Sequence, residues 1–214
     1  AQFGHNEFVV ALGYKGDYIK RWFGDYATLG HDLKVDLSNR SVEQRGEHPE
    51  DWTIELIETG LNTATGGRIK RLQPYLGDET CLLTWGDGVA DVDLNELVAF
   101  HQAHGKLATL TAARPAARFG HLELDGDAIT EFSEKPQTAE GWINGAFFVF
   151  EPGVFDYIEG DDTQFELEPL MNLAKDGQLM AYKHHGFWQC MDTIRDKKRL
   201  ESLWETDAPW KIWS

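Results

Sequence analysis

Two aspartates each stand between a predicted strand and a predicted helix. Asp87 follows the apolar residues 81–83 within the segment TWGDGVADVD, and Asp192 follows the segment FWQCM at residues 187–191. If these strands are neighbours, both carboxylates lie at the edge of an α/β sheet where such sheets bind ligands. Carboxylates combined with phosphate oxygens are the usual ligands of protein-bound Mg²⁺. The sequence therefore predicts a magnesium site formed by Asp87 and Asp192 beside a phosphate group.

Other interpretations of these aspartates remain open at the level of spacing. Asp91 and Asp93 lie in the same segment and are alternative metal ligands, although Asp91 is typical of a turn and Asp93 of a helix N-cap. Asp192 also precedes a helix, so it is a candidate N-cap as well. The glycines on both sides of Asp87 allow a ligand or another backbone segment to approach closely.

A second candidate site is the loop TGLNTATGGR at residues 59–68, which precedes a predicted helix. The apolar face of that helix includes Ile69, Leu72 and Leu76. Free N–H groups and the helix dipole make such a start a natural anion site. A plain helix start with a threonine cap explains the same residues equally well.

Strand and helix patterns alternate along most of the chain. Apolar or alternating runs predict strands at residues 8–12, 52–59, 81–83, 108–112, 142–150 and 179–191, a polar excursion with strand character at 27–51, and a hairpin at 121–134. Helical spacing predicts helices near residues 18–26, 69–76, 94–104 and 194–204. This order predicts an α/β, Rossmann-like three-layer sandwich with a mostly parallel central sheet. Asn144-Gly145 inside one strand predicts a bulge where a ligand approaches.

Composition narrows the class of protein. A chain of 214 residues is long enough for one well-packed domain, here predicted over 1–214 with a C-terminal tail at 205–214. The formal net charge of −16 argues against a nucleic-acid or anionic-membrane partner. Cys81 and Cys190 both lie in apolar runs, which indicates buried thiols in a reducing cytoplasm. The sequence shows neither a membrane-spanning run nor a signal peptide.

Eight motifs, in order along most of the chain, carry a family resemblance: ALGYKG from Ala11, TGLNTATGGRIKR from Thr59, TWGDGVADVD from Thr84, EKP from Glu134, NGAFFVF from Asn144, EPLMNLA from Glu168, GFWQCMDT from Gly186 and APWKIW from Ala208. With them the chain resembles the sugar-nucleotide pyrophosphorylases, which have the nucleotide-diphospho-sugar transferase type of fold. The excursion at residues 27–51 is most similar to the glucose-1-phosphate cytidylyltransferase branch.

The resemblance implies transfer of CMP from CTP to α-D-glucose 1-phosphate, giving CDP-glucose and pyrophosphate with Mg²⁺ as cofactor. It implies that Asp87 and Asp192 bind the metal and that Asp87 is catalytic. The other matched positions are Thr63, Arg68 and Gly86 for the nucleotide, Glu134 and Lys135 near the sugar phosphate with Lys135 also catalytic, and Asn144 and Gly145 at a sugar-facing turn. It also implies a cytoplasmic homo-oligomer, a trimer or hexamer, in nucleotide-sugar biosynthesis for O-antigen and lipopolysaccharide.

One part of the family pattern has no counterpart in this sequence. The family opens with a strand and the phosphate-binding loop G-G-x-G-T-R-L, and residues 1–7 correspond to a position beyond them. The chain thus resembles an N-terminally incomplete member, expected to bind CTP poorly. Two alternatives follow: a nucleotide- or sugar-phosphate-binding protein without catalysis, and a nucleotidyltransferase that uses UTP or dTTP.

Overall fold

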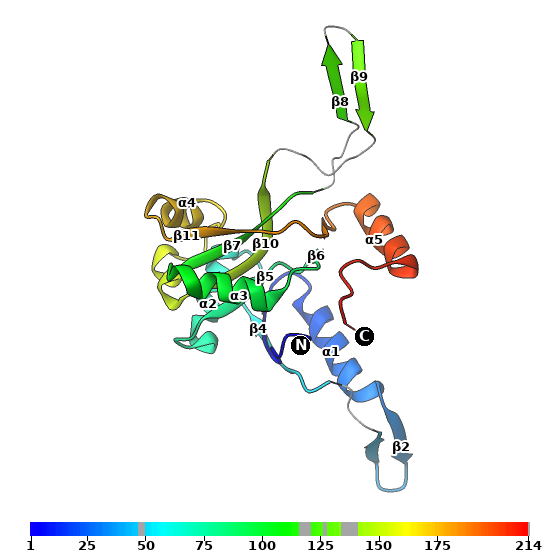
Figure 1. Cartoon of the computed structure of the whole chain (residues 1–214). Coiled ribbons are helices and arrows are strands. Elements are labelled where there is room, and N and C mark those ends of the chain that lie inside the picture. Colours follow the sequence, from blue (N-terminus) through cyan, green and yellow to red (C-terminus); the bar gives the residue numbers. More distant parts are fainter. Residues whose placement is uncertain (47–49, 116–120, 126–127, 134–140, 214) are drawn as a thin grey trace. The chain divides into compact units, whose positions relative to one another are not determined.

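The computed structural model describes residues 1–46, 50–115, 121–125, 128–133 and 141–213. The chain forms two compact units, the first comprising residues 1–77 and 155–169 and the second residues 78–154 and 170–214. Figure 1 gives the order of the helices and strands along the chain. Each unit is described separately below.

The first unit contains a parallel strand pair and two helices. β1 (Glu7–Leu12) pairs with β4 (Thr53–Glu58) in a register that joins Phe8 to Ile54. α1 (Gly16–Leu29) follows β1, and α2 (Thr65–Leu76) follows β4 and packs against β1. The 3₁₀ helix η1 (Pro152–Tyr157) leads into the returning segment. The buried apolar side chains of this unit are Leu12, Ile69, Leu72, Phe155, Ile158 and Phe165.

The predicted polar excursion is a small antiparallel hairpin. β2 (Asp32–Asp36) pairs with β3 (Ser41–Arg45), directly after α1 in the chain (Figure 1). Asp36 Oδ1 accepts hydrogen bonds from the Ser38 backbone N–H and hydroxyl, which fixes the start of the connecting turn. Leu33, Val35 and Val42 are exposed in the hairpin.

The second unit is built on a four-stranded sheet. Its strand order is β11 (Leu179–Lys183), β7 (Ala108–Ala113), β10 (Ile143–Phe150) and β5 (Cys81–Thr84). β11 runs parallel to β7, whereas β10 runs antiparallel to both of its neighbours. α3 (Leu94–His104) lies across β7, β10 and β11 (Figure 1). Its residue Leu97 packs with Val92 and Val149 in the core.

The remaining elements are two strand pairs and two helices. β6 (Gly88–Ala90) pairs antiparallel with β12 (Trp188–Cys190), and β8 (His121–Asp125) pairs with β9 (Ala128–Ser133) as the predicted hairpin. α4 (Glu168–Lys175) and α5 (Ile194–Thr206) complete the chain. The predicted α/β class is therefore confirmed, with mixed strand directions in the sheet of the second unit.

A buried polar network joins α3 to β7 and to the end of β10. His104 Nδ1 accepts from the Lys106 N–H, so the neutral ring donates from Nε2 to Thr109 Oγ1 at 2.7 Å. The Thr109 hydroxyl then donates to His101 Nδ1 at 2.8 Å, and His101 Nε2–H donates to Glu151 Oε1 at 3.0 Å. Every nitrogen and hydroxyl in the network has a partner when both histidines are neutral.

This network sets the pKa of two of its members. Burial lowers the pKa of His104, and His101 and Lys106 act in the same direction. Burial alone would raise the pKa of Glu151, but hydrogen bonds from Thr80 and His101 outweigh it, so the pKa of Glu151 is lowered. Both shifts favour neutral His104 and ionised Glu151 in the folded protein.

Among the described residues, no helix has the length and apolarity needed to cross a membrane.

Candidate metal and substrate site

Asp87 and Asp192 lie at the same end of the short ladder formed by β6 and β12. Cys190 pairs with Gly88, and the Met191 N–H donates to the Asp87 carbonyl oxygen at 2.8 Å. The antiparallel pairing therefore places the residue before β6 next to the residues that follow β12. Both aspartates are exposed. The backbones of the two residues that the sequence predicted as a pair therefore lie at the same end of this ladder.

The alternative roles of the neighbouring aspartates are resolved by their hydrogen bonds. Asp93 caps α3, since its Oδ1 accepts from the N–H groups of Asn95 and Glu96. Asp192 is not the cap of α5, because Thr193 takes that position in a reciprocal capping box with Asp196. Asp93 thus has a structural role at the start of α3, whereas Asp192 does not cap α5.

The chemistry of the pair fits a hard divalent cation. Mg²⁺ is usually bound by one or two carboxylates while substrate phosphates and waters complete the octahedron, so a two-carboxylate donor set suits it. Within the described residues, no cluster of three or more histidine, cysteine, aspartate or glutamate side chains forms a self-sufficient metal cage. Asp87 and Asp192 would therefore hold a metal that shares its coordination with a phosphate group.

Cys190 lies beside Asp192 and is held as a thiol. Its Sγ donates to Asp192 Oδ2 at 3.3 Å. Burial raises the pKa of Cys190 to about 11, and the hydrogen bond and negative charge of Asp192 act in the same direction. Both cysteines are free thiols, as the sequence predicted.

The predicted bulge at Asn144-Gly145 is present in β10. The register of β10 against β7 shifts between Asn144 and Phe148, and Ala146 adopts a left-handed backbone with φ of 59°. Asn144 Oδ1 accepts from the Ala146 N–H at 2.8 Å and stabilises this turn. A Cβ on Gly145 would lie 2.8 Å from the Thr111 carbonyl oxygen, so only glycine fits there.

The bulge adjoins the turn that carries Asp87. The Trp85 N–H donates to the Ala146 carbonyl oxygen at 3.4 Å, and Trp188 Nε1 of β12 donates to the Gly145 carbonyl oxygen at 2.8 Å. Gly86 is exposed, and an added Cβ there would meet nothing within 4 Å. Gly86, Asp87, Asn144, Gly145 and Asp192 thus form one continuous region of the second unit.

Thr63 and Arg68 belong to the first unit, and the structure gives Arg68 internal partners. Its Nη1 donates to the carbonyl oxygens of Leu12 and Gly60 and to the Thr59 hydroxyl, at 2.8–3.1 Å. These contacts join the ends of β1 and β4. The Arg68 guanidinium therefore holds this loop in place. The sequence predicted a nucleotide contact for Arg68 but not this structural role.

The glycines at the start of α2 serve close packing within the first unit. The N–H groups of Gly66 and Gly67 donate to the Thr163 carbonyl oxygen, at 2.9 and 3.3 Å. A Cβ on Gly67 would lie 2.5 Å from the Asp161 carbonyl oxygen. The first N–H groups of the helix are thus occupied by the segment at residues 161–163, which favours the plain helix start over an anion site. The predicted threonine cap is wrong, because the N-cap is Ala64, which makes no side-chain hydrogen bond. Glu134 and Lys135 lie outside the described residues.

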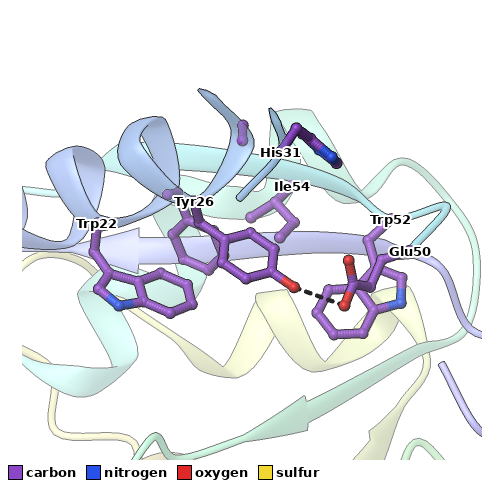
Figure 2. Close-up of a pocket in the computed structure, with 8 residues that line it drawn as sticks. Trp22, Tyr26, His31, Glu50, Trp52 and Ile54 are labelled. Carbon is purple, nitrogen blue, oxygen red and sulfur yellow. Dashed lines mark hydrogen bonds between the residues drawn. The ribbon is translucent and has the colours of Figure 1, made fainter. Parts of the chain in front are cut away.

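A hollow of about 300 Å³ in the first unit was not anticipated from the sequence. Its lining includes Trp22 and Tyr26 of α1, with Trp52 and Glu50 on the opposite side (Figure 2). The rings of Trp22 and Tyr26 stack at 5.2 Å between centroids, and the Tyr26 hydroxyl donates to Glu50 Oε1 at 2.6 Å. The i, i+4 spacing of two exposed aromatic residues in α1 was the available sequence signal.

The helices and the parallel and antiparallel strands of the two units place the chain in the α/β class of proteins. A family model described as "Nucleotidyl transferase" matches residues 31–203. This match spans most of the chain, so the chain belongs to the nucleotidyl transferase family.

Individual relatives agree with this assignment. A glucose-1-phosphate cytidylyltransferase of Salmonella typhi is 47% identical over 212 residues, which cover 98% of this chain and 82% of the relative. A probable glucose-1-phosphate cytidylyltransferase of Bacillus subtilis is 45% identical over 99% of this chain and 83% of its own length. Among solved structures, HddC from Yersinia pseudotuberculosis superposes with a TM-score of 0.65 at 19% identity, covering 92% of this chain and 78% of HddC. This last similarity concerns the fold alone.

Proposed function

We propose that this protein transfers CMP from CTP to α-D-glucose 1-phosphate and forms CDP-glucose and pyrophosphate. The observation that carries the proposal is the identity of 45–47% to glucose-1-phosphate cytidylyltransferases over nearly the whole chain. A phosphate oxygen of the sugar phosphate attacks the α-phosphorus of CTP, and the bond from that phosphorus to the oxygen bridging to the β-phosphate breaks. Pyrophosphate leaves with the bonding electrons, and no covalent bond to the protein forms.

Asp87 and Asp192 are proposed to hold Mg²⁺, whose bound charge would offset the charge on the reacting phosphates. Phosphoryl transfer of this type depends on positioning and charge neutralisation more than on a protein nucleophile. The arrangement of the two aspartates at one end of the β6–β12 ladder supports this assignment. Asp87 is the proposed catalytic carboxylate of the pair.

The bulge in β10 is proposed to receive the sugar. Asn144 and Gly145 lie beside the Asp87 turn, and the left-handed residue that follows them keeps the strand out of regular pairing. Glu134 and Lys135 are proposed to act near the sugar phosphate, with Lys135 supplying positive charge. Gly86 leaves open space for the nucleotide.

Thr63 and Arg68 are proposed to act on the nucleotide side of the reaction. Arg68 contributes through the loop that it organises, since its guanidinium is hydrogen-bonded to backbone groups at the ends of β1 and β4. Thr63 lies in the same loop and is partly buried. CTP and glucose 1-phosphate are cytoplasmic metabolites, so a cytoplasmic location accompanies the proposed reaction.

A homo-oligomer, trimeric or hexameric as the family resemblance implies, is proposed, with the aromatic hollow of the first unit as its contact surface. Trp22, Tyr26 and Trp52 are 54%, 43% and 44% exposed around it. Large contiguous apolar patches on a folded chain commonly mark an interaction surface. A second copy of the chain is the proposed occupant.

The reaction is tested by incubating the protein with glucose 1-phosphate, Mg²⁺ and one of CTP, UTP, dTTP, ATP or GTP, and by resolving the products with ³¹P NMR. We expect CDP-glucose from CTP and at least a tenfold lower rate with the other nucleotides. Product formation should stop with excess EDTA and return with Mg²⁺. A higher rate with UTP or dTTP would overturn the assignment of the base, and CTP binding without product would overturn catalysis.

A further inference from the structure

A second polar contact lies at the opposite end of the ladder that carries Asp87 and Asp192. His184 Nε2 is 2.9 Å from Asp91 Oδ1 and 3.1 Å from the Phe187 carbonyl oxygen. Both of those atoms are acceptors, so Nε2 of His184 carries a proton. The His184 side chain is 8% exposed and that of Asp91 30%. The contact is thus a largely buried pair.

Asp91 depends on this histidine. Its Oδ1 atom is shielded from water and accepts no hydrogen bond in the described structure. Its compensation is the electrostatic attraction of His184 Nε2, which lies 2.9 Å away and donates its hydrogen bond to the Phe187 carbonyl oxygen. A buried carboxylate oxygen without such compensation costs free energy. The pair therefore holds Asp91 against the segment that joins β11 to β12.

Both members are tied to the rest of the second unit through their backbones. The His184 N–H donates to the Ala112 carbonyl oxygen at 2.9 Å and extends the pairing of β11 with β7. The Asp91 N–H donates to the Phe187 carbonyl oxygen at 3.2 Å and extends the pairing of β6 with β12. The pair thus links the main sheet to the ladder.

Gly186 shows how closely the segment packs on the pair. A Cβ on this residue would lie 2.3 Å from Asp91 Oδ1 and 2.8 Å from His184 Cε1. Real Cβ atoms do not approach other atoms so closely, so any larger side chain at residue 186 would separate Asp91 from His184.

We infer that Asp91 and His184 are positioning residues that fix the spacing of Asp87 and Asp192 through the β6–β12 ladder. The ladder has three residue pairs, about 10 Å of strand, so its register depends on anchors at both ends. Asp87 and Met191 form one end, and Asp91, Phe187 and His184 form the other. This inference rests on the proposed function, because it assigns the metal to Asp87 and Asp192.

The test compares three substitutions that disturb the pair with one rescue and one control that do not. His184→Phe removes the donor at similar volume, Asp91→Asn removes the charge, and Gly186→Ala inserts a methyl group between the two. His184→Gln keeps an N–H near the position of Nε2 and serves as the rescue. His185→Phe is the matched control, since His185 is exposed and makes an edge contact with Trp142 that phenylalanine retains.

Two measurements separate positioning from stability. The first is the dissociation constant of Mn²⁺ from the protein with CTP, followed by electron paramagnetic resonance. The second is steady-state kinetics of CDP-glucose formation. For His184→Phe, Asp91→Asn and Gly186→Ala we expect 10- to 100-fold weaker Mn²⁺ binding and a 10- to 100-fold lower kcat. The KM for glucose 1-phosphate should stay within about twofold, whereas the KM for CTP should rise, because the proposed metal shares its coordination with the nucleotide phosphates and the two affinities are linked.

The possible outcomes decide between this inference and the proposed function. A purely structural pair would lower the folded fraction and hence kcat, but would leave the Mn²⁺ affinity of the folded molecules unchanged, and that result would overturn the inference. Asp192→Asn is measured alongside. If Asp192→Asn leaves Mn²⁺ binding intact, the proposed metal pair fails. If Asp192→Asn abolishes binding while all three pair variants bind as the wild type does, only the positioning role fails. Asp91→Asn tests the contact with little change in volume if His184→Phe does not fold.

Discussion

At the scale of single residues, the carboxylate pair carries the strongest functional prediction. Asp87→Asn and Asp192→Asn should each lower kcat for CDP-glucose formation at least 100-fold, because loss of a metal-held charge removes several kcal/mol of transition-state stabilisation. The rates are measured by pyrophosphate release at saturating CTP and glucose 1-phosphate. Asp93→Asn is the control in the same segment, since asparagine caps a helix as well as aspartate does. Equal losses in all three variants would contradict the assignment of the pair.

A second prediction concerns the glycines that begin α2. Gly67→Ala should lower the free energy of unfolding by about 1–3 kcal/mol, because its Cβ would meet the backbone of Asp161 at 2.5 Å. Gly24→Ala in α1 is the matched control, since a Cβ there meets nothing within 4 Å. Alanine should stabilise that helix by about 0.5–1 kcal/mol. Urea denaturation measures both variants, and a stabilising Gly67→Ala would show that the close approach is absent in solution.

The residue scale also shows what could be predicted from the sequence. Asp87 and Asp192 could be proposed as a pair because each follows an apolar run and strand ends gather at a sheet edge, although Asp87 directly precedes the short strand β6 and not the predicted helix. The bonds that Arg68 makes to the ends of β1 and β4 join residues up to 56 positions apart, so no local pattern indicates them. His184 gave no signal either, since its partner Asp91 is distant in the sequence and its role arises from packing.

At the scale of elements, the network that joins α3 to β7 predicts a pH dependence of stability. The pKa of His104 is lower in the folded protein than its ordinary value of 6.5, so the unfolded chain binds more protons between those two values. The contribution of His104 to stability is therefore complete above pH 6.5 and is lost as the pH falls towards the folded-state pKa. Glu151 adds a second loss below its ordinary pKa of 4.5, because its folded-state pKa is also lowered.

The measurement is the free energy of unfolding in urea between pH 8 and pH 5. We expect it to decrease below pH 6.5 in the wild type and to decrease less steeply in His104→Gln, which cannot titrate. His5→Gln is the control at an exposed histidine and should keep the wild-type slope. If His104→Gln and the wild type have the same slope, the network does not control this pH dependence.

Elements differed in how well the sequence predicted them. Long apolar strands such as β7 and β10 and the helix α3 have enough residues to show a clear period. β6 and β12 have three residues each, which is too few for a period, and they exist because they pair with each other. The candidate metal site depends on that pairing, so its geometry could not be derived from the sequence.

At the scale of the whole chain, alternating strands and helices were sufficient to predict the α/β class. The antiparallel direction of β10 could not be predicted, because the direction of a strand follows from its connections and not from its own residues. The aromatic surface around Trp22 was also missed. Its residues come from α1 and from the segment that enters β4, which are separated by the hairpin of β2 and β3.

That surface gives the last prediction, which concerns assembly. The protein should elute with a mass three or six times that of the 24.3 kDa chain in size-exclusion chromatography with light scattering. Trp22→Ser or Trp52→Ser should weaken self-association by about 30-fold or more, since a buried interface tryptophan commonly contributes at least 2 kcal/mol. Tyr75→Ser in α2 is the control, because Tyr75 is 48% exposed and does not line the hollow. If the wild-type protein stays monomeric at about 50 μM, the proposal that a second copy of the chain occupies the hollow is wrong. An oligomer that only Tyr75→Ser dissociates would place the interface on α2.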